Sequence, residues 1–130
     1  MSQKHTEEFE IGGYRYIMNH WAPDTVDDCV WPIAHSSLGS LLAQEEARVE
    51  DLMAHAVASL SKDQMKLITR KLSESTHYVG PDTDGKKVSL EKTYAGHFRG
   101  RYKSLMAFRV KGLKAQLSEF FTDGVFDLSL

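Results

Sequence analysis

Histidine is the side chain best suited to binding metals and moving protons near neutral pH, and the chain has six of them. No two of them are spaced at i, i+3 or i+4, and no HExxH pattern is present. They are His5, His20, His35, His55, His77 and His97. Scattered histidines of this kind are surface or packing residues, so the sequence predicts no metal site and no cofactor.

The other reactive groups are also isolated from one another. Cys29 is the only cysteine and lies on an apolar stripe without an activating base nearby, so we interpret it as a buried, inert thiol. Asp82 and Asp84 resemble the start of a calcium loop, but the closing glutamate is missing and a plain turn is expected. The chain has no phosphate-binding glycine loop and no GxSxG pattern. We therefore predict that the protein is not an enzyme.

Composition indicates one globular domain. The chain has 130 residues, of which 42% are hydrophobic and 26% charged, enough for one modest core. We expect a single domain over 1–130, with 1–8 and 122–130 as loose ends. The lone cysteine, the polar N-terminus and the lack of a long apolar run predict a cytosolic protein that does not contact membranes.

Two short β-structures are predicted. The pair Gly12–Gly13 between β-prone runs is typical of a two-residue hairpin turn, because both positions can take positive φ. The expected register is Ile11–Tyr14, Phe9–Tyr16 and Glu10–Arg15. A second small hairpin or loop is expected near residues 77–90, with Asp84–Gly85 as its turn.

The rest of the chain is predicted to be helical. A helix should begin near Pro23 and kink near Trp31, because Pro32 removes a helix hydrogen bond and clashes with the preceding turn. Further helices are expected over 45–60, from a capping box at Ser61–Gln64 onward, and over roughly 99–121. The last of these has the apolar stripe Tyr102, Leu105, Met106, Val110, Leu113, Leu117, Phe120 and Phe121. The predicted fold class is thus mainly α, a single domain of about four helices with an N-terminal β-hairpin.

Charge is divided unevenly along the chain although the net charge is only −2. Residues 1–60 hold three basic and ten acidic side chains, whereas residues 86–117 hold nine basic side chains against Glu91. Three interpretations remain open: the two halves face each other within one monomer, they join successive copies head to tail, or the basic segment binds nucleic acid. The aromatic residues among the basic ones favour binding of nucleic acid. The acidic residues in 1–60 argue against it, because they would repel phosphate groups.

The stretch from Thr93 to Leu105 resembles a known family. It is similar to a motif of the tail assembly chaperones of long-tailed bacteriophages. That motif consists of an aromatic residue, then His-Phe, one further residue, Gly-Arg-Tyr and a helix. The matching positions are Tyr94, His97, Phe98, Gly100, Arg101 and Tyr102. Similarity extends more weakly from about residue 14 to residue 121, through the segments 37–42, 71–76 and 84–90. The family's last helix is usually more apolar than this one, which carries Arg109, Lys111 and Lys114.

The resemblance implies a function without catalysis. Such chaperones coat the tape measure protein, recruit tail tube subunits, self-associate into spiral arrays, and are absent from the mature virion. We therefore expect a protein of the host cytoplasm whose partners are the tape measure protein, the tail tube protein and further copies of itself. Nucleic acid is not an expected partner, and a small nucleic-acid-associated regulator using the basic segment 86–114 is the alternative.

The motif residues allow two roles. In the first, His97 and Arg101 fix the turn into the last helix by bonding to backbone carbonyls, and Phe98 and Tyr102 pack beneath it. In the second, they contact a partner or the adjacent subunit. The predicted contact residues are His97, Phe98, Arg99, Arg101, Tyr102 and Arg109, and Trp31 and Pro32 are assigned to the kink and its packing.

Overall fold

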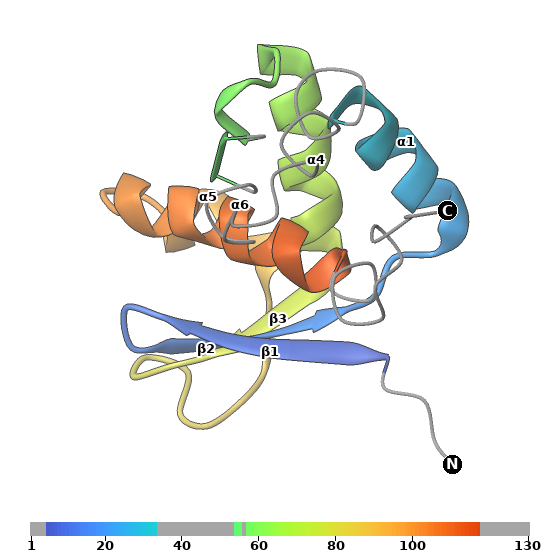
Figure 1. Cartoon of the computed structure of the whole chain (residues 1–130). Helices are drawn as coiled ribbons and strands as arrows, with labels where there is room; N and C mark the ends of the chain where they lie inside the picture. The colour runs from blue at the N-terminus through green and yellow to red at the C-terminus, as the bar shows by residue number, and fades with distance from the viewer. Residues whose placement is uncertain (1–4, 34–53, 56, 118–130) are drawn as a thin grey trace, which may run out of the picture.

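The protein folds into two layers, with a β-sheet covered on one face by helices (Figure 1). The computed structural model describes residues 5–33, 54–55 and 57–117, with only the backbone at 30–33. About 53% of the described residues are helical and 20% lie in strands, which form one four-stranded antiparallel sheet. The predicted fold class, mainly α, is therefore wrong: the protein is mixed α/β.

The sheet has the strand order β1-β2-β3-β4. Strands β1 (Thr6–Ile11) and β2 (Tyr14–Asn19) form the predicted N-terminal hairpin, and its register is confirmed at all three expected pairs. β1 begins at Thr6, inside the stretch 1–8 that we expected to be loose. Residues 122–130 lie outside the described residues.

The second hairpin is present as β3 (Thr76–Val79) and β4 (Val88–Ser89). It does not stand alone, because β3 also pairs with β2 in a register that sets Tyr16 opposite Tyr78. This pairing merges the two hairpins into one sheet. The fold-class prediction failed here. Both hairpins were predicted from their turns, but they were expected to be separate small elements beside a helical domain.

Four helices lie among the described residues: α1 (Pro23–Ile33), α4 (Lys62–Glu74), α5 (Leu90–His97) and α6 (Tyr102–Gln116). The predicted capping box of α4 is confirmed, because the Ser61 and Gln64 side chains each bond the backbone N–H of the other. α5 was not predicted, and α6 is shorter than expected. Most of the predicted helix over 45–60 lies outside the described residues.

The backbone of α1 remains helical through Trp31 and Pro32 to Ile33, and residues 34–53 are outside the described part of the chain. The side chains of Trp31 and Pro32 are likewise outside it. Their assigned role in a kink and its packing therefore stays a prediction.

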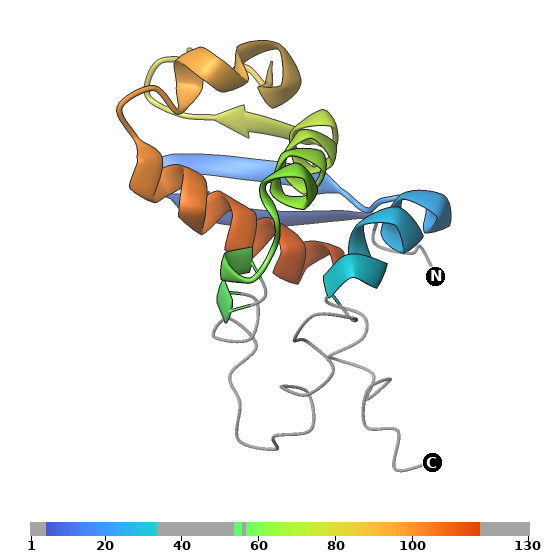
Figure 2. The ribbon, with the colours of Figure 1, turned by 90° about the horizontal axis from the view of Figure 1, so that it is seen from above.

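The core lies between the sheet and the helices. The inner face of β2 contributes Tyr16 and Met18, α4 contributes Leu72, and α6 contributes Phe108 and Leu113, all buried. Seen from above, α6 runs over the β1 side of the sheet while α5 lies on the β3 side (Figure 2). The layers thus meet through aromatic rings on β2 and a long apolar face of α6.

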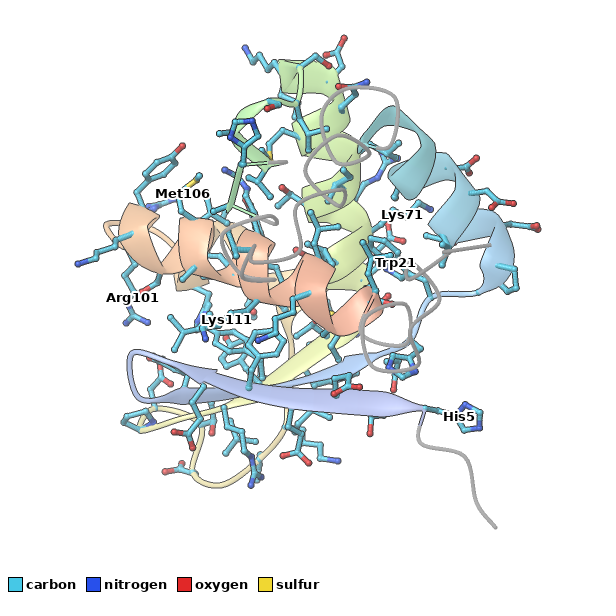
Figure 3. All side chains as sticks on the ribbon, viewed as in Figure 1. His5, Trp21, Lys71, Arg101, Met106 and Lys111 are labelled. Carbon is cyan, nitrogen blue, oxygen red and sulfur yellow. The ribbon has the colours of Figure 1, made fainter. Side chains whose placement is uncertain are left out.

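Trp21 joins the exit of β2 to both long helices. Its backbone N–H donates to Oε1 of Gln116 at 2.7 Å, and its indole Nε1–H donates to the Lys71 carbonyl at 3.2 Å. Figure 3 shows Trp21 and Lys71 side by side. The Gln116 amide also donates to the Asn19 carbonyl at 2.8 Å, so the C-terminal end of α6 is fixed to the end of β2.

Candidate functional site

The residues that resemble the chaperone family meet at the corner between α5 and α6. His97 and Phe98 are buried there, and Gly100 turns the chain at a φ of +74°. Arg99, Arg101 and Tyr102 are exposed at the surface of this corner. Arg109 is not part of it and lies two turns further along α6, so the structure divides the predicted contact residues between two places.

Tyr102 differs most from its expected position. The apolar stripe predicted it to be buried, but 66% of its surface is exposed. Helical side chains point back toward the N-terminus of their helix. Tyr102 is the first residue of α6, so its side chain points back beyond the start of the helix and stays exposed.

His97 lies inside a cage of aromatic rings. Its Nε2 is 2.7 Å from the hydroxyl of Tyr16, a bond between α5 and the middle of β2. The rings of Tyr14, Tyr78 and Phe98 surround it, with centroids 4.7, 4.1 and 4.8 Å away. His97 therefore fixes the corner through a tyrosine hydroxyl of the sheet, rather than through the backbone carbonyl we expected.

Burial sets the protonation state of this pair. It lowers the pKa of His97 below its ordinary value of 6.5, and the nearby Arg101 guanidinium lowers it further. Burial also raises the pKa of Tyr16 to about 12. At neutral pH the bond thus joins a neutral imidazole and a neutral phenol, and neither group acts as an acid or base exposed to solvent.

We expect this burial to make the protein less stable in mild acid. Below pH 6.5 the unfolded chain protonates His97 while the folded protein does not, so the free energy of unfolding falls as the pH drops. The loss ends once the pH passes below the folded pKa. An NMR titration of the His97 ring checks this directly: the ring should titrate below 6.5 in the folded protein, and a pKa at or above that value would contradict the cage.

Arg101 closes the cage from the solvent side. Its guanidinium lies over the ring of Tyr14, with Cζ 4.9 Å from the ring centroid. The Tyr14 hydroxyl donates to Oδ2 of Asp82 at 3.1 Å, which connects the corner to the loop between β3 and β4. Asp82, Lys92, His97 and Arg101 line a cleft of about 440 Å³ beside the cage, in which the carboxylate offsets part of the positive charge.

A second hollow lies between three helices, and we call it the α4–α5–α6 groove. It has a volume of about 250 Å³ and is lined by Lys66, Thr69, Arg70, Ser73, Glu91, Tyr94 and Arg109. Arg109 crosses from α6 to α4, because its Nε donates to Oγ1 of Thr69 at 2.9 Å. Its Nη1 lies 3.2 Å from the sulfur of Met106, which lies on the side of α6 away from the sheet (Figure 3).

Sequence reasoning missed Tyr14, Tyr16 and Phe108 as partners of the motif. Tyr14 and Tyr16 were placed on the apolar face of the hairpin, but nothing local connects that face with His97. The ring of Phe108, fully buried, lies 5.5 Å from that of Phe98 and 5.6 Å from that of Tyr16. The alternation of tyrosines along β2 was the one available signal for an aromatic cluster.

The described part of the chain contains no group of three or more histidine, cysteine or acidic residues placed to hold a metal ion. Within the same residues no helix has the length and apolar character needed to cross a bilayer. Fold and site thus define a two-layer α/β protein with an aromatic corner and a helix-lined groove. Comparison with protein-family models, curated proteins and solved structures gave no significant match.

Proposed function

We propose that this protein is a tail assembly chaperone of a long-tailed bacteriophage. In this role it coats the tape measure protein and recruits tail tube subunits in the host cytoplasm, by binding helices and by self-association, without catalysis. The observation that carries the proposal is that the residues resembling the family's motif lie together at one corner of the structure. Tyr94, His97 and Phe98 pack as one cluster, Gly100 makes the turn, and Arg101 covers it.

The distribution of charge in space supports self-association. α1 and the α5–α6 corner lie at opposite ends of the structure (Figures 1 and 2). Three aspartates of α1, Asp24, Asp27 and Asp28, are exposed at one end. The other end carries exposed basic residues that form no ion pair within the described part of the chain. They are Lys86, Lys87, Lys92, Arg99 and Lys103. Opposite charges at opposite ends favour a head-to-tail contact between copies.

The alternative function, a nucleic-acid-associated regulator, is less well supported. Binding of single strands uses exposed aromatic rings next to cations. Of the aromatic residues interleaved with the basic segment, Phe98 and Phe108 are buried in the core and Tyr94 is half-buried. Only Tyr102 among them is exposed, which leaves a single ring available for stacking.

Binding to the tape measure protein tests the proposal. Overlapping helical segments of the tape measure protein from the same phage should bind the full chain, as measured by isothermal titration calorimetry. A protein that binds none of these segments, while remaining folded by circular dichroism, would rule out the chaperone function.

Light scattering tests the self-association. We expect assemblies larger than a monomer at low salt that dissociate at high salt, because exposed charges are screened. The double substitution Arg99→Glu and Lys103→Glu should give a folded monomer, since both side chains are exposed and lack ion pairs among the described residues. Lys62→Glu, exposed at the start of α4, is the matched control. A strict monomer at high concentration in both salts would rule out the head-to-tail contact.

A further inference from the structure

The α4–α5–α6 groove follows one face of α4. Four of its residues come from α4 at the spacing i, i+3, i+4 and i+7, which places Lys66, Thr69, Arg70 and Ser73 along one helical face. Such a stripe extends roughly 10 Å, or two helical turns. The groove volume of about 250 Å³ is below the roughly 300 Å³ at which small-molecule pockets begin and suits one or two side chains.

Charge in the groove is mainly positive. Lys66, Arg70 and Arg109 line it, against the single carboxylate of Glu91. Arg70 reaches Glu74 at 3.8 Å on its exposed side, a weak pair in solvent. An arriving group that carries negative charge would therefore meet a net excess of cations.

Arg109 and Thr69 have unused hydrogen-bonding capacity at the floor of the groove. Arg109 contacts Thr69 through Nε and Met106 through Nη1, and Nη2 has no partner among the described residues. The hydroxyl of Thr69, only 5% exposed, accepts from Arg109 and donates to no described group. A guanidinium that is held in place with Nη2 available can donate a charge-assisted hydrogen bond to a carboxylate oxygen.

We infer that the α4–α5–α6 groove binds a side-chain carboxylate on an amphipathic helix of a partner protein, with Arg109 as the principal contact. The Tyr94 ring and the alkyl stems of Lys66 and Arg70 then pack against apolar residues beside that carboxylate. This inference rests on the proposed function and specifies which helices the protein selects: acidic ones. It also gives a role to Arg109, one of the basic residues that make α6 less apolar than the last helix of the family it resembles.

A pair of synthetic peptides tests the inference. Both are 18-residue amphipathic helices of leucine, alanine and glutamine with a fluorescein label, and they differ only by a central glutamate or glutamine. Fluorescence anisotropy should show that the glutamate peptide binds about tenfold more tightly, the difference expected for a hydrogen-bonded charge pair. The preference should disappear in Arg109→Gln and persist in Lys62→Gln, which removes an exposed cation that does not line the groove.

A second variant, Arg70→Gln, separates loss of binding from loss of folding. Arg109 bonds the buried Thr69, so Arg109→Gln can disturb the fold, whereas Arg70 is exposed. Arg70→Gln should reduce the glutamate preference by severalfold without changing the circular dichroism spectrum. If both peptides bind equally well, or if both variants keep the full preference, the inference is overturned.

Two further outcomes separate this inference from its alternatives. If the glutamate peptide binds more tightly to a full-length variant with Glu119→Gln, Asp123→Asn and Asp127→Asn, then acidic residues of the chain itself compete for the groove, and the assignment to a partner is overturned. If tape measure segments bind but show no dependence on Arg109 or Arg70, the chaperone function stands and the inference alone fails.

Discussion

Replacing Phe108 with alanine is expected to lower the free energy of unfolding by about 3–5 kcal/mol, the cost of emptying a buried aromatic site. Phe108 has no exposed surface and lies where the two layers meet. Its ring centroid is 6.2 Å from that of Phe9, 5.6 Å from that of Tyr16 and 5.5 Å from that of Phe98. Removing it takes away these ring contacts between α6 and the sheet and leaves the cage around His97 without one of its supports.

Urea unfolding followed by circular dichroism measures this loss. The matched control is Tyr102→Ala on the same helix, where the side chain is 66% exposed. Its effect should stay within about 0.5 kcal/mol, as for other surface substitutions. Equal losses in the two variants would show that Phe108 does not occupy the core as described.

Replacing Gly80 with alanine is expected to cost about 1–3 kcal/mol, because an added methyl group has no room. A Cβ atom at Gly80 would overlap with Cδ1 of Tyr14, so the ring must move. That ring also stacks beneath Arg101, and its hydroxyl donates to Asp82. A substitution in the β3–β4 loop should therefore loosen the α5–α6 corner through the Tyr14 ring.

Gly96→Ala is the natural control for Gly80→Ala. Gly96 lies in α5, and a Cβ atom there would meet nothing within 4 Å. Alanine is favoured over glycine in a helix by up to about 1 kcal/mol, so this variant should be as stable as the original protein or more so. Near-ultraviolet circular dichroism should change in Gly80→Ala, which moves a tyrosine, and not in Gly96→Ala. Unchanged tyrosine signals in both would contradict the close approach of Gly80 to Tyr14.

The parts of the fold that could be predicted depend on contacts between near neighbours in the sequence. The register of β1 with β2 follows from a two-residue turn, and the start of α4 follows from the pair Ser61 and Gln64. The pairing of β2 with β3 has no such local signal, since Tyr16 and Tyr78 are separated by almost half the chain. Both hairpins were predicted, but the fold class was wrong because the pairing that joins them into one sheet was not predicted.

The candidate site shows the same division. The stretch around His97 could be singled out from its residue types, but its hydrogen-bond partner Tyr16 is on the first hairpin. The apolar periodicity correctly predicted that Leu105 and Leu113 are buried, but it was wrong for Tyr102. A repeat of apolar positions does not show where along a helix the contact with the sheet begins. The groove around Arg109 depends on three helices at once, and no spacing within one of them predicts it.

The pairing between β2 and β3 also has a consequence for how the protein reaches its native state. Each hairpin closes a short loop and can form quickly, whereas joining them requires the chain between Asn19 and Thr76 to be gathered first, at a larger entropic cost. A high share of such distant pairings slows folding. During synthesis on the ribosome, β2 therefore remains without its second neighbour until most of the chain has been made, and its tyrosines stay uncovered for that time.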